Sequence, residues 1–330
     1  MTRKKRNPGR VAFVAACLLI FVSGNRVSGN RAQAQAAQDL SAFQGTVRAE
    51  PYRNPIIFTR TELDEKTGKP LGAAKVWVME EDGSGLRQLT YGTNYNDHPA
   101  LFSDRTHGLY SEFRGDTFDR KAGARLVKIN VYSGEQEVFA EAAGCSLHHV
   151  ALTAKDDQIA YQHDCGNRRS QRIGRGADEY EINMRAVNPV ILEDSLIFMH
   201  QKDPIASPGR ASLVRLYGHG RGAKAVFLTD DQHLNRRPVG APDGEWIAWQ
   251  TDAAGNEEIF LSRTDGSQAR NLTNAPSNEG HPWFSRDGKW IVFESDRTGA
   301  DELWKINLET SQQQQLTFGG KKYSSREPRW

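Results

Sequence analysis

Short runs of β-branched and aromatic residues, separated by turn residues, recur along most of this chain. Runs of this kind predict β-strands, and the clearest are Leu109–Phe113, Ile159–Tyr161, Leu196–Met199 and Ile291–Phe293. Asp-Gly pairs lie between such runs, because glycine accepts the positive φ that tight hairpin turns require. The pattern therefore predicts an all-β protein.

The strand pattern repeats most clearly near the C-terminus. The segment Ala241–Asp252 and the segment Ser285–Asp296 share an Asp-Gly pair, an aromatic residue and a following Ser-Asp or Thr-Asp pair at the same offsets. Pro238 and Pro282, which precede these copies, lie 44 residues apart. A period of this length is typical of a propeller blade with four short strands. A single blade cannot bury both of its faces, so several must pack side by side.

Weaker copies of the repeat extend towards the N-terminus and predict six blades. Asn54–Arg60 aligns with the second strand of a blade, and Arg326–Trp330 aligns with a first strand. We therefore expect a six-bladed β-propeller that is closed by the C-terminal strand, which pairs into the first blade and leaves no exposed sheet edge. In blade three, Glu179–Met184 is either the third or the fourth strand.

The repeat resembles that of TolB-like six-bladed β-propellers, which carry the WD40-like PD40 repeat. The resemblance is strong over residues 235–317, partial over 54–139 and faint over 140–230. The namesake of this family has an additional N-terminal domain that contacts the Tol transmembrane proteins. Only a short stretch precedes the first strand here, so the sequence is similar to a propeller-only relative. The resemblance implies a binding protein and makes an outer-membrane-associated lipoprotein a possible partner class.

The N-terminus predicts export. Basic residues precede an apolar run from Val11 to Val22, and Ala32-Gln33-Ala34 is a plausible cleavage site. The expected domains are thus a signal peptide (1–34), a short linker (35–53) and the propeller (54–330). We expect a periplasmic or secreted protein. Cys17 follows a sequence like a lipoprotein acylation box, but few apolar residues precede it, which favours an exported chain over a lipoprotein.

Removal of the predicted signal peptide changes the net charge of the protein. Seven of the 43 basic residues and none of the 41 acidic residues lie in the first 34 positions, so the mature chain carries a net charge of −5. This charge gives no electrostatic basis for binding nucleic acid. The mature sequence also contains no apolar run long enough to span a bilayer, and we expect a monomer.

Two cysteines remain after the signal peptide, in a compartment where disulfides persist. If residues 154–157 form a hairpin turn, then Cys145 lies opposite Cys165 or its neighbour. A disulfide between them is the expected state, and two buried thiols are the alternative. The same register places His163 opposite His148.

One position of the repeat gathers polar residues. The residue before each blade-opening proline, or before its equivalent Val150, is expected near one mouth of the central channel, and these residues are His98, His149, Asn188, Arg237, His281 and Glu327. Imidazole and carboxylate groups can bind a divalent ion such as Mn²⁺, Zn²⁺ or Ca²⁺. The candidate metal ligands are His98, His148, His149, His163 and His281. Arg237 could bind a carboxylate or a phosphate.

Two functions follow from this arrangement. The first is non-catalytic binding of an envelope protein or a cell-envelope glycan, without a cofactor. The second is a metal-dependent lyase or hydrolase acting on an acidic polysaccharide, because the channel histidines resemble those of oligogalacturonate lyases in chemistry and placement. There a base removes the proton beside a uronate carboxylate. Histidines before these prolines also have a structural explanation, since an imidazole can cap a loop.

A second candidate surface lies in blade three. The arginines Arg168, Arg169, Arg172 and Arg175, with nearby glycines, predict a long basic loop. Loops on a rigid scaffold often carry binding, so this loop is an alternative site of interaction.

Overall fold

The computed structural model describes residues 51–153, 156, 158–166, 168–174, 180–182, 186–201, 209–218 and 222–330. The regular elements in these ranges are all β-strands, as the sequence predicts. Within the same ranges, no helix is long and apolar enough to cross a membrane. The predicted signal peptide lies outside the described residues, so it stays a prediction.

The strands form antiparallel groups of four that we number along the chain. Group 1 contains β24 (Tyr323–Arg329), β1 (Pro55–Glu62), β2 (Lys75–Glu80) and β3 (Arg87–Gln88). Group 2 contains β4 (Tyr95–Leu101), β5 (His107–Phe113), β6 (Ala124–Asn130) and β7 (Gln136–Ala140). Group 3 contains β8 (Cys145–Leu152), β9 (Ile159–Cys165), β10 (Arg168–Ile173) and β11 (Tyr180–Ile182). One parallel pairing, between Ala124 and Ser146, joins groups 2 and 3 into a single sheet.

The remaining strands form three separate sheets. Group 4 contains β12 (Ala186–Ile191), β13 (Ser195–His200), β14 (Ser212–Tyr217) and β15 (Lys224–Phe227). Group 5 contains β16 (Arg236–Gly240), β17 (Trp246–Thr251), β18 (Glu258–Arg263) and β19 (Arg270–Asn271). Group 6 contains β20 (Glu279–Phe284), β21 (Trp290–Ser295), β22 (Glu302–Asn307) and β23 (Gln313–Gln315).

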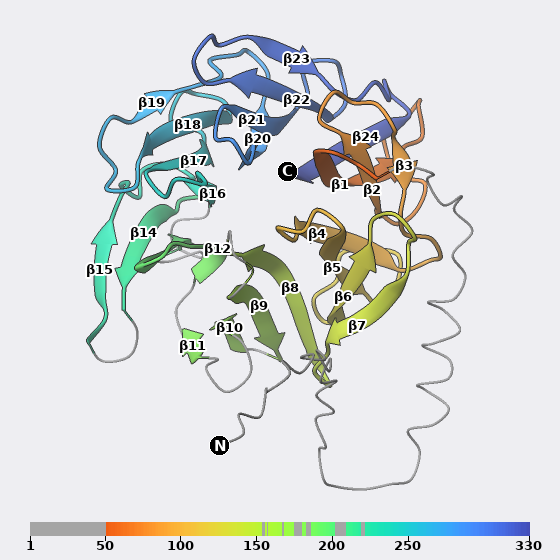
Figure 1. The fold of residues 1–330 in the computed structure, drawn as a ribbon, viewed down its shortest axis with the longest axis horizontal. Coiled ribbons are helices and arrows are strands. Elements are labelled where there is room, and N and C mark those ends of the chain that lie inside the picture. The colour runs from red at the N-terminus through yellow and green to blue at the C-terminus, as the bar shows by residue number, and fades with distance from the viewer. Residues whose placement is uncertain are drawn as a thin grey trace, which may run out of the picture. The chain divides into compact units, whose positions relative to one another are not determined.

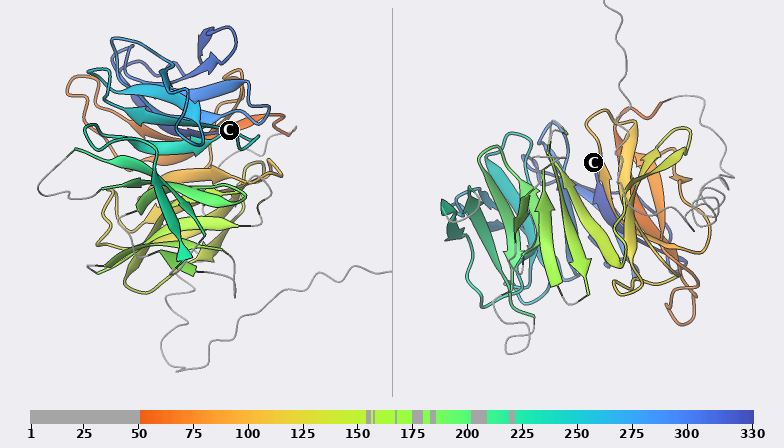
Figure 2. Two further views of the ribbon diagram at one scale, coloured as in Figure 1. Left: turned by 90° about the vertical axis from the view of Figure 1, so that its left-hand side faces the viewer. Right: turned by 90° about the horizontal axis from the view of Figure 1, so that it is seen from below.

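The groups surround a common centre. In Figure 1 the innermost strands are β24, β4, β8, β12, β16 and β20, while the fourth strand of each group lies farthest out. The side views in Figure 2 show the strands of neighbouring groups standing next to one another around this centre. The first strand of each group therefore brings its residues to one shared region.

Apolar side chains bury the faces between neighbouring groups. Between groups 5 and 6, for example, Ile259 of β18 belongs to one buried cluster with Phe293 of β21. Another cluster joins group 6 to group 1, because Phe58 of β1 packs with Val292 of β21 and with Trp330. Burial of each large apolar side chain contributes roughly 1.5–3 kcal/mol. Packing between groups is thus the main source of stability.

A repeated Leu-Thr pair ties the fourth strand to the third. In group 6 the backbone N–H of Leu303 donates a hydrogen bond to Thr317 Oγ1 over 2.8 Å, and in group 5 that of Ile259 donates one to Thr273 Oγ1 over 3.0 Å. In group 1, Val76 donates in the same way to Thr90 Oγ1 over 2.9 Å. The threonine hydroxyl replaces a ladder hydrogen bond where the short fourth strand ends. This explains why the pair recurs in the sequence.

The two chain ends pair as the sequence predicts. β24 lies antiparallel to β1, with Thr59 opposite Arg326 and Thr61 opposite Ser324. Thr59 Oγ1 also donates a hydrogen bond of 3.0 Å to the carbonyl oxygen of Arg326, which is 267 residues away along the chain. The edge of β1 is therefore paired.

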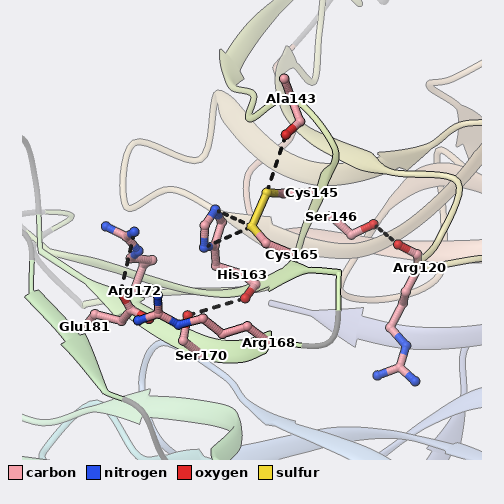
Figure 3. The surroundings of a disulfide bond; sticks show 10 residues. All are labelled: Arg120, Ala143, Cys145, Ser146, His163, Cys165, Arg168, Ser170, Arg172 and Glu181. Carbon is pink, nitrogen blue, oxygen red and sulfur yellow. Dashed lines mark hydrogen bonds and ion pairs between the residues drawn. A yellow bond between two sulfur atoms is a disulfide. The ribbon is translucent and has the colours of Figure 1, made fainter.

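Group 3 answers two questions that the sequence left open, which are the place of its last strand and the state of the two cysteines. The segment Tyr180–Ile182 is β11, which pairs with β10, so it is the fourth strand of the group. Cys145 lies opposite Cys165 on the adjacent strands β8 and β9, and the two sulfur atoms form a disulfide. Figure 3 shows this bond with His163 beside it. The predicted disulfide is confirmed.

The predicted basic loop is wrong. Residues Arg168–Ile173 form strand β10, because Gly166 takes a φ of 59° and allows a tight hairpin that places Arg168 opposite Cys165. Arg168 and Arg172 form ion pairs of 2.7 and 3.5 Å with Glu181 on β11 (Figure 3). The side chain of Arg169 and the whole of Arg175 lie outside the described residues. The described arginines therefore hold two strands together.

The disulfide makes a prediction about stability. Replacing both Cys145 and Cys165 by Ser opens a loop with a sequence separation of 20 residues, which should lower the free energy of unfolding by about 3 kcal/mol. Urea denaturation of the exported protein measures the change. Dithiothreitol should destabilise the wild type by a similar amount and leave the double variant unaffected. Equal denaturation midpoints for wild type and variant would contradict the prediction.

Candidate functional site

The six residues predicted to share one channel mouth also share one backbone conformation. His98, His149, Asn188, Arg237, His281 and Glu327 all have φ between 48° and 54°. Each lies where the register of an innermost strand shifts against the second strand of its group. Such irregularities turn a side chain out of the regular alternation of the strand. We call these residues the six left-handed residues.

The residue that follows explains why the irregularity falls here. It is proline in five groups and Val150 in group 3. Proline has no N–H to give to a ladder and is tolerated in a sheet mainly at edges and bulges. A positive φ is uncommon for residues other than glycine and costs about 1–2 kcal/mol. Six equivalent residues thus hold a strained conformation that the surrounding sheets must stabilise.

Three consecutive groups join their polar side chains at this level. His281 Nδ1 lies 2.6 Å from Glu294 Oε1, and its Nε2 lies 3.1 Å from Glu327 Oε1. The backbone N–H of His98 donates to Glu327 Oε2 over 3.0 Å. Glu294 also accepts from the backbone N–H of Glu327 over 3.1 Å. These residues are buried, so group 6, group 1 and group 2 are connected by a buried polar network.

Burial and neighbouring groups shift the pKa values of the side chains in this network in different directions. Burial, with Glu327 next to it, raises the pKa of the Asp97 carboxyl well above its usual range. Burial also lowers the pKa of His98 to about 3, so its imidazole is neutral near pH 7. For Glu327 burial acts in the opposite direction, but the neighbouring imidazoles of His98 and His281 outweigh it and keep the pKa of the Glu327 carboxyl well below its usual range. Of these two carboxyls, Asp97 is thus the one that holds a proton more readily.

Three imidazoles gather between groups 2 and 3. The nearest ring nitrogens of His98, His148 and His149 all lie within 4.8 Å of one another. His148 Nδ1 is 2.6 Å from His149 Nδ1, and His148 Nε2 is 3.2 Å from Asp164 Oδ2. Burial lowers the pKa of both His148 and His149, which favours the neutral form that binds metals.

The donor set of these imidazoles fits a divalent ion. Three neutral nitrogens with a carboxylate beside one of them resemble the ligand set and supporting carboxylate of zinc-type sites. The close approach of His148 and His149 also has a second explanation, because one protonated ring nitrogen can donate to the other. Both explanations are consistent with the positions of the rings.

His163 does not join this cluster. It lies opposite Leu147, while Gln162 lies opposite His148, so the expected register was wrong by one residue. The cause is the irregularity at His149, which adds a residue to β8 between the disulfide and the hairpin turn. Successive side chains point to opposite faces of a strand, so His163 Nε2 lies 3.3 Å from Cys165 Sγ beside the disulfide (Figure 3).

Arg237 and Asn188 complete the set on the other groups. Arg237 donates to Gln250 Oε1 over 2.9 Å, and Gln250 donates in turn to Glu257 over 2.6 Å. Burial lowers the pKa of Arg237 to about 10, which leaves it charged. Asn188 lines the same narrow cavity as Arg237. Neither residue contacts the imidazole cluster through a hydrogen bond in the described part of the chain.

Two cavities lie along the centre. A narrow one of about 30 Å³ is lined by His149, Asn188, Arg237, His281, Trp283 and Arg329, among others. A wider chamber of about 570 Å³ is lined largely by apolar residues, including Leu192, Phe284 and Trp330. Trp283, Ala151 and Pro189 line both, so the chamber and the narrow cavity adjoin.

Sequence reasoning missed four residues close to the six left-handed residues, two on the second strands and two further along the first strands. Glu294 and Gln250 occupy the same place on the second strand, opposite the residue before a left-handed residue. Trp283 and Arg329 each lie two residues after a left-handed residue. Extending the alignment of the repeat by these offsets would have found them.

Comparison with known proteins identifies the repeat. Residues 221–330 match the family model described as the TolB beta propeller domain. No curated protein matches the chain at a significant level. The family match and the structures below confirm the predicted resemblance to TolB-like propellers.

Solved structures show a similar fold over most of the chain. TolB from Acinetobacter baumannii has a TM-score of 0.65 at 16% identity, covering 85% of this chain and 67% of that one. A putative TolB from Agrobacterium tumefaciens has a TM-score of 0.57 at 15% identity, covering 80% and 88%. An oligogalacturonate lyase in complex with manganese has a TM-score of 0.50 at 12% identity, covering 83% and 84%. At these identities the likeness is one of fold.

The left-handed backbone predicts how Asn188 tolerates substitution. Asn188→Gly should leave the free energy of unfolding within about 0.5 kcal/mol of the wild type, because glycine adopts positive φ freely. Asn188→Val should lower it by about 1–3 kcal/mol, since a β-branched residue is strained there. Chemical denaturation measures both. At Val138, an exposed position of β7 without a positive φ, the order should reverse, with Val138→Gly the destabilising change. Equal stability of Asn188→Val and Asn188→Gly would contradict the prediction.

Proposed function

We propose that this protein is an exported, non-catalytic binding propeller that recognises an envelope protein or a cell-envelope glycan at the opening of its centre. The six left-handed residues carry this proposal, because strained backbone conformations cluster at functional sites and this one recurs at six equivalent positions, four of which line one cavity. Rigid sheets hold these residues, which reduces the entropy lost on binding.

We further propose that the six strand groups are six blades of a closed ring. Six buried apolar clusters lie between successive groups, and one of them joins group 6 to group 1 through Phe58 and Val292. The pairing of β24 with β1 supports the same closure. A closed ring leaves only short, protected sheet edges and keeps the opening at a fixed width.

Two observations support export. The basic and apolar N-terminal residues have the pattern of a signal peptide. The disulfide between Cys145 and Cys165 would persist in the periplasm or outside the cell but not in a reducing cytosol. The resemblance to TolB-like propellers agrees with an envelope protein as the partner.

The polar network favours binding over catalysis. His281 is held between Glu294 and Glu327, and His148 contacts Asp164. Because these groups are already engaged with one another, they have little freedom to exchange protons with a substrate. Their arrangement stabilises the position of the left-handed residues.

The imidazole cluster supports one alternative function, a metal-dependent lyase or hydrolase acting on an acidic polysaccharide. His98, His148 and His149 would hold the ion. A bound ion would stabilise the negative charge that develops beside a uronate carboxylate when its neighbouring proton is removed. The fold likeness to an oligogalacturonate lyase that binds manganese agrees with this alternative.

Binding at the opening can be tested with an obstructing variant. We expect Asn188→Lys to lose retention of the ligand, because Asn188 lines the narrow cavity and a longer charged side chain would fill it. Immobilised full-length protein is offered solubilised peptidoglycan fragments and, separately, solubilised envelope proteins, and the retained material is quantified. The control Glu137→Lys changes an exposed side chain of the outer strand β7 and should retain ligand normally. Equal retention by Asn188→Lys and wild type would contradict binding at this opening.

Metal analysis separates the two functions. We expect the exported protein to contain no stoichiometric divalent ion, because hydrogen bonding between His148 and His149 accounts for their close approach. Elemental analysis is done on the wild type, on a variant with His98 and His148 both changed to Ala, and on His107→Ala. His107 is a half-buried imidazole that contacts Asp104 away from the cluster. A stoichiometric ion that is lost only in the double variant would overturn the binding proposal in favour of the enzyme.

A further inference from the structure

Two guanidinium groups line one narrow cavity that has no carboxylate in its lining. Arg237 from β16 and Arg329 from β24 both border the cavity of about 30 Å³. Within the described residues neither forms an ion pair with a carboxylate. Arg237 donates to the amide oxygen of Gln250, and Arg329 donates to the carbonyl oxygen of Pro328 over 2.9 Å.

Arg329 is the less satisfied of the two. Its Nε atom is buried and has no hydrogen-bond partner among the described residues. Its guanidinium lies over the ring of Trp283, with 4.6 Å between the Cζ atom and the ring centroid. A guanidinium offers five donors in a planar fork that matches a carboxylate. Glu327 and Glu294 lie near enough to favour the charged form of Arg329, but neither lines the cavity. Neither guanidinium thus has a carboxylate at ion-pair distance among the described residues, although Glu327, Asp97 and Glu294 lie near Arg329.

The neighbouring chamber is lined by apolar residues together with the charged side chains of Asp156, Glu193, Asp243 and Arg286. Its volume of about 570 Å³ lies within the range of small-ligand sites, roughly 300–1,000 Å³. Phe284, Trp330 and Leu192 contribute to its largely apolar lining, and Trp283 borders both the chamber and the arginines. A ligand in the chamber would thus bury an apolar body against the aromatic rings.

The difference in volume limits which part of a ligand can reach the arginines. The cavity that they line has a volume of about 30 Å³, much smaller than that of the adjoining chamber. A small terminal group of a ligand can therefore lie against Arg237 and Arg329 while the larger part of the ligand stays in the chamber. A terminal carboxylate has the right charge and size.

We propose that the chamber binds the free C-terminal carboxylate of a partner protein whose last residues are apolar. The carboxylate accepts hydrogen bonds from Arg329 and Arg237, and the apolar side chains pack in the chamber against Trp283 and Phe284. This inference rests on the proposed binding function and narrows its ligand to a protein, because glycans lack an apolar end.

The test compares N-acetylated peptides that end in Leu-Phe as the free acid and as the C-terminal amide. Trp283 and Trp330 line the chamber, so tryptophan fluorescence of the full chain reports binding, and calorimetry gives the affinity. We expect the acid to bind at least ~10-fold more tightly than the amide, the usual scale for a charge-assisted hydrogen bond. Dodecanoate is a second probe, which has a carboxylate and an apolar chain but no peptide.

Variants locate the interaction. Arg329→Gln and Arg237→Gln should each weaken binding of the acid by at least ~10-fold and leave the amide unchanged. Arg329→Lys, which keeps the charge but not the fork, should bind with intermediate affinity. Arg114→Gln, at an exposed arginine that pairs with Glu141, is the control and should bind like the wild type.

The outcomes distinguish this inference from the proposed function. Equal binding of acid and amide, or no binding of either, overturns the inference even if a variant fails to fold. Binding of dodecanoate without binding of the peptide acid also overturns it, because the ligand would then be a small carboxylic acid. In these cases the proposed function still stands if Asn188→Lys loses an envelope ligand. If the peptide acid binds through Arg329 while Asn188→Lys retains the envelope ligands as the wild type does, the inference stands and the proposed binding of those ligands at this cavity is overturned.

Discussion

Packing of one sheet face against the next is the interaction on which this structure depends. A four-stranded group exposes two faces, and one group alone can cover neither. Phe58, Val292 and Trp330 illustrate the solution, since they come from groups at opposite ends of the chain and share one buried cluster. Because each apolar face needs a partner, the order of the groups around the centre is fixed before any polar residue contributes. The polar centre is therefore a consequence of apolar packing at the sides.

The six left-handed residues show how this scaffold is used. A regular strand would point alternate side chains into the neighbouring sheets, and the irregularity in each first strand releases one residue from that pattern. The packing of the surrounding sheets offsets the free-energy cost of the positive φ at this residue. His98, His281 and Glu327 consequently meet from three different groups. The same scaffold places Arg237 and Arg329 at one cavity, although they are far apart in the sequence.

Much of this arrangement could be predicted from the repeat, and the exceptions have physical causes. The repeat placed the strands, the pairing of the chain ends and the six equivalent positions, because turns and prolines mark them at fixed offsets. It misplaced His163, since one extra residue at His149 shifts every later pair in β8 and β9. It took Arg168–Ile173 for a loop because this run has no alternating apolar residues before Ile173, and its arginines are paired by Glu181 on another strand. It missed Arg329 because the repeat does not show which side chains line a cavity, and Arg329 is a candidate binding residue only through the cavity that it lines.

The strand β24 has a role that goes beyond completing a sheet. It carries both Glu327 of the polar network and Arg329 of the narrow cavity, and it pairs with β1, from the opposite end of the described chain. Folding and site assembly are therefore the same event, since neither residue reaches its place until this strand docks. A partially folded molecule would present no ligand site. Conversely, a ligand held by Arg329 would oppose the detachment of β24. Binding of the ligand would therefore stabilise the folded molecule.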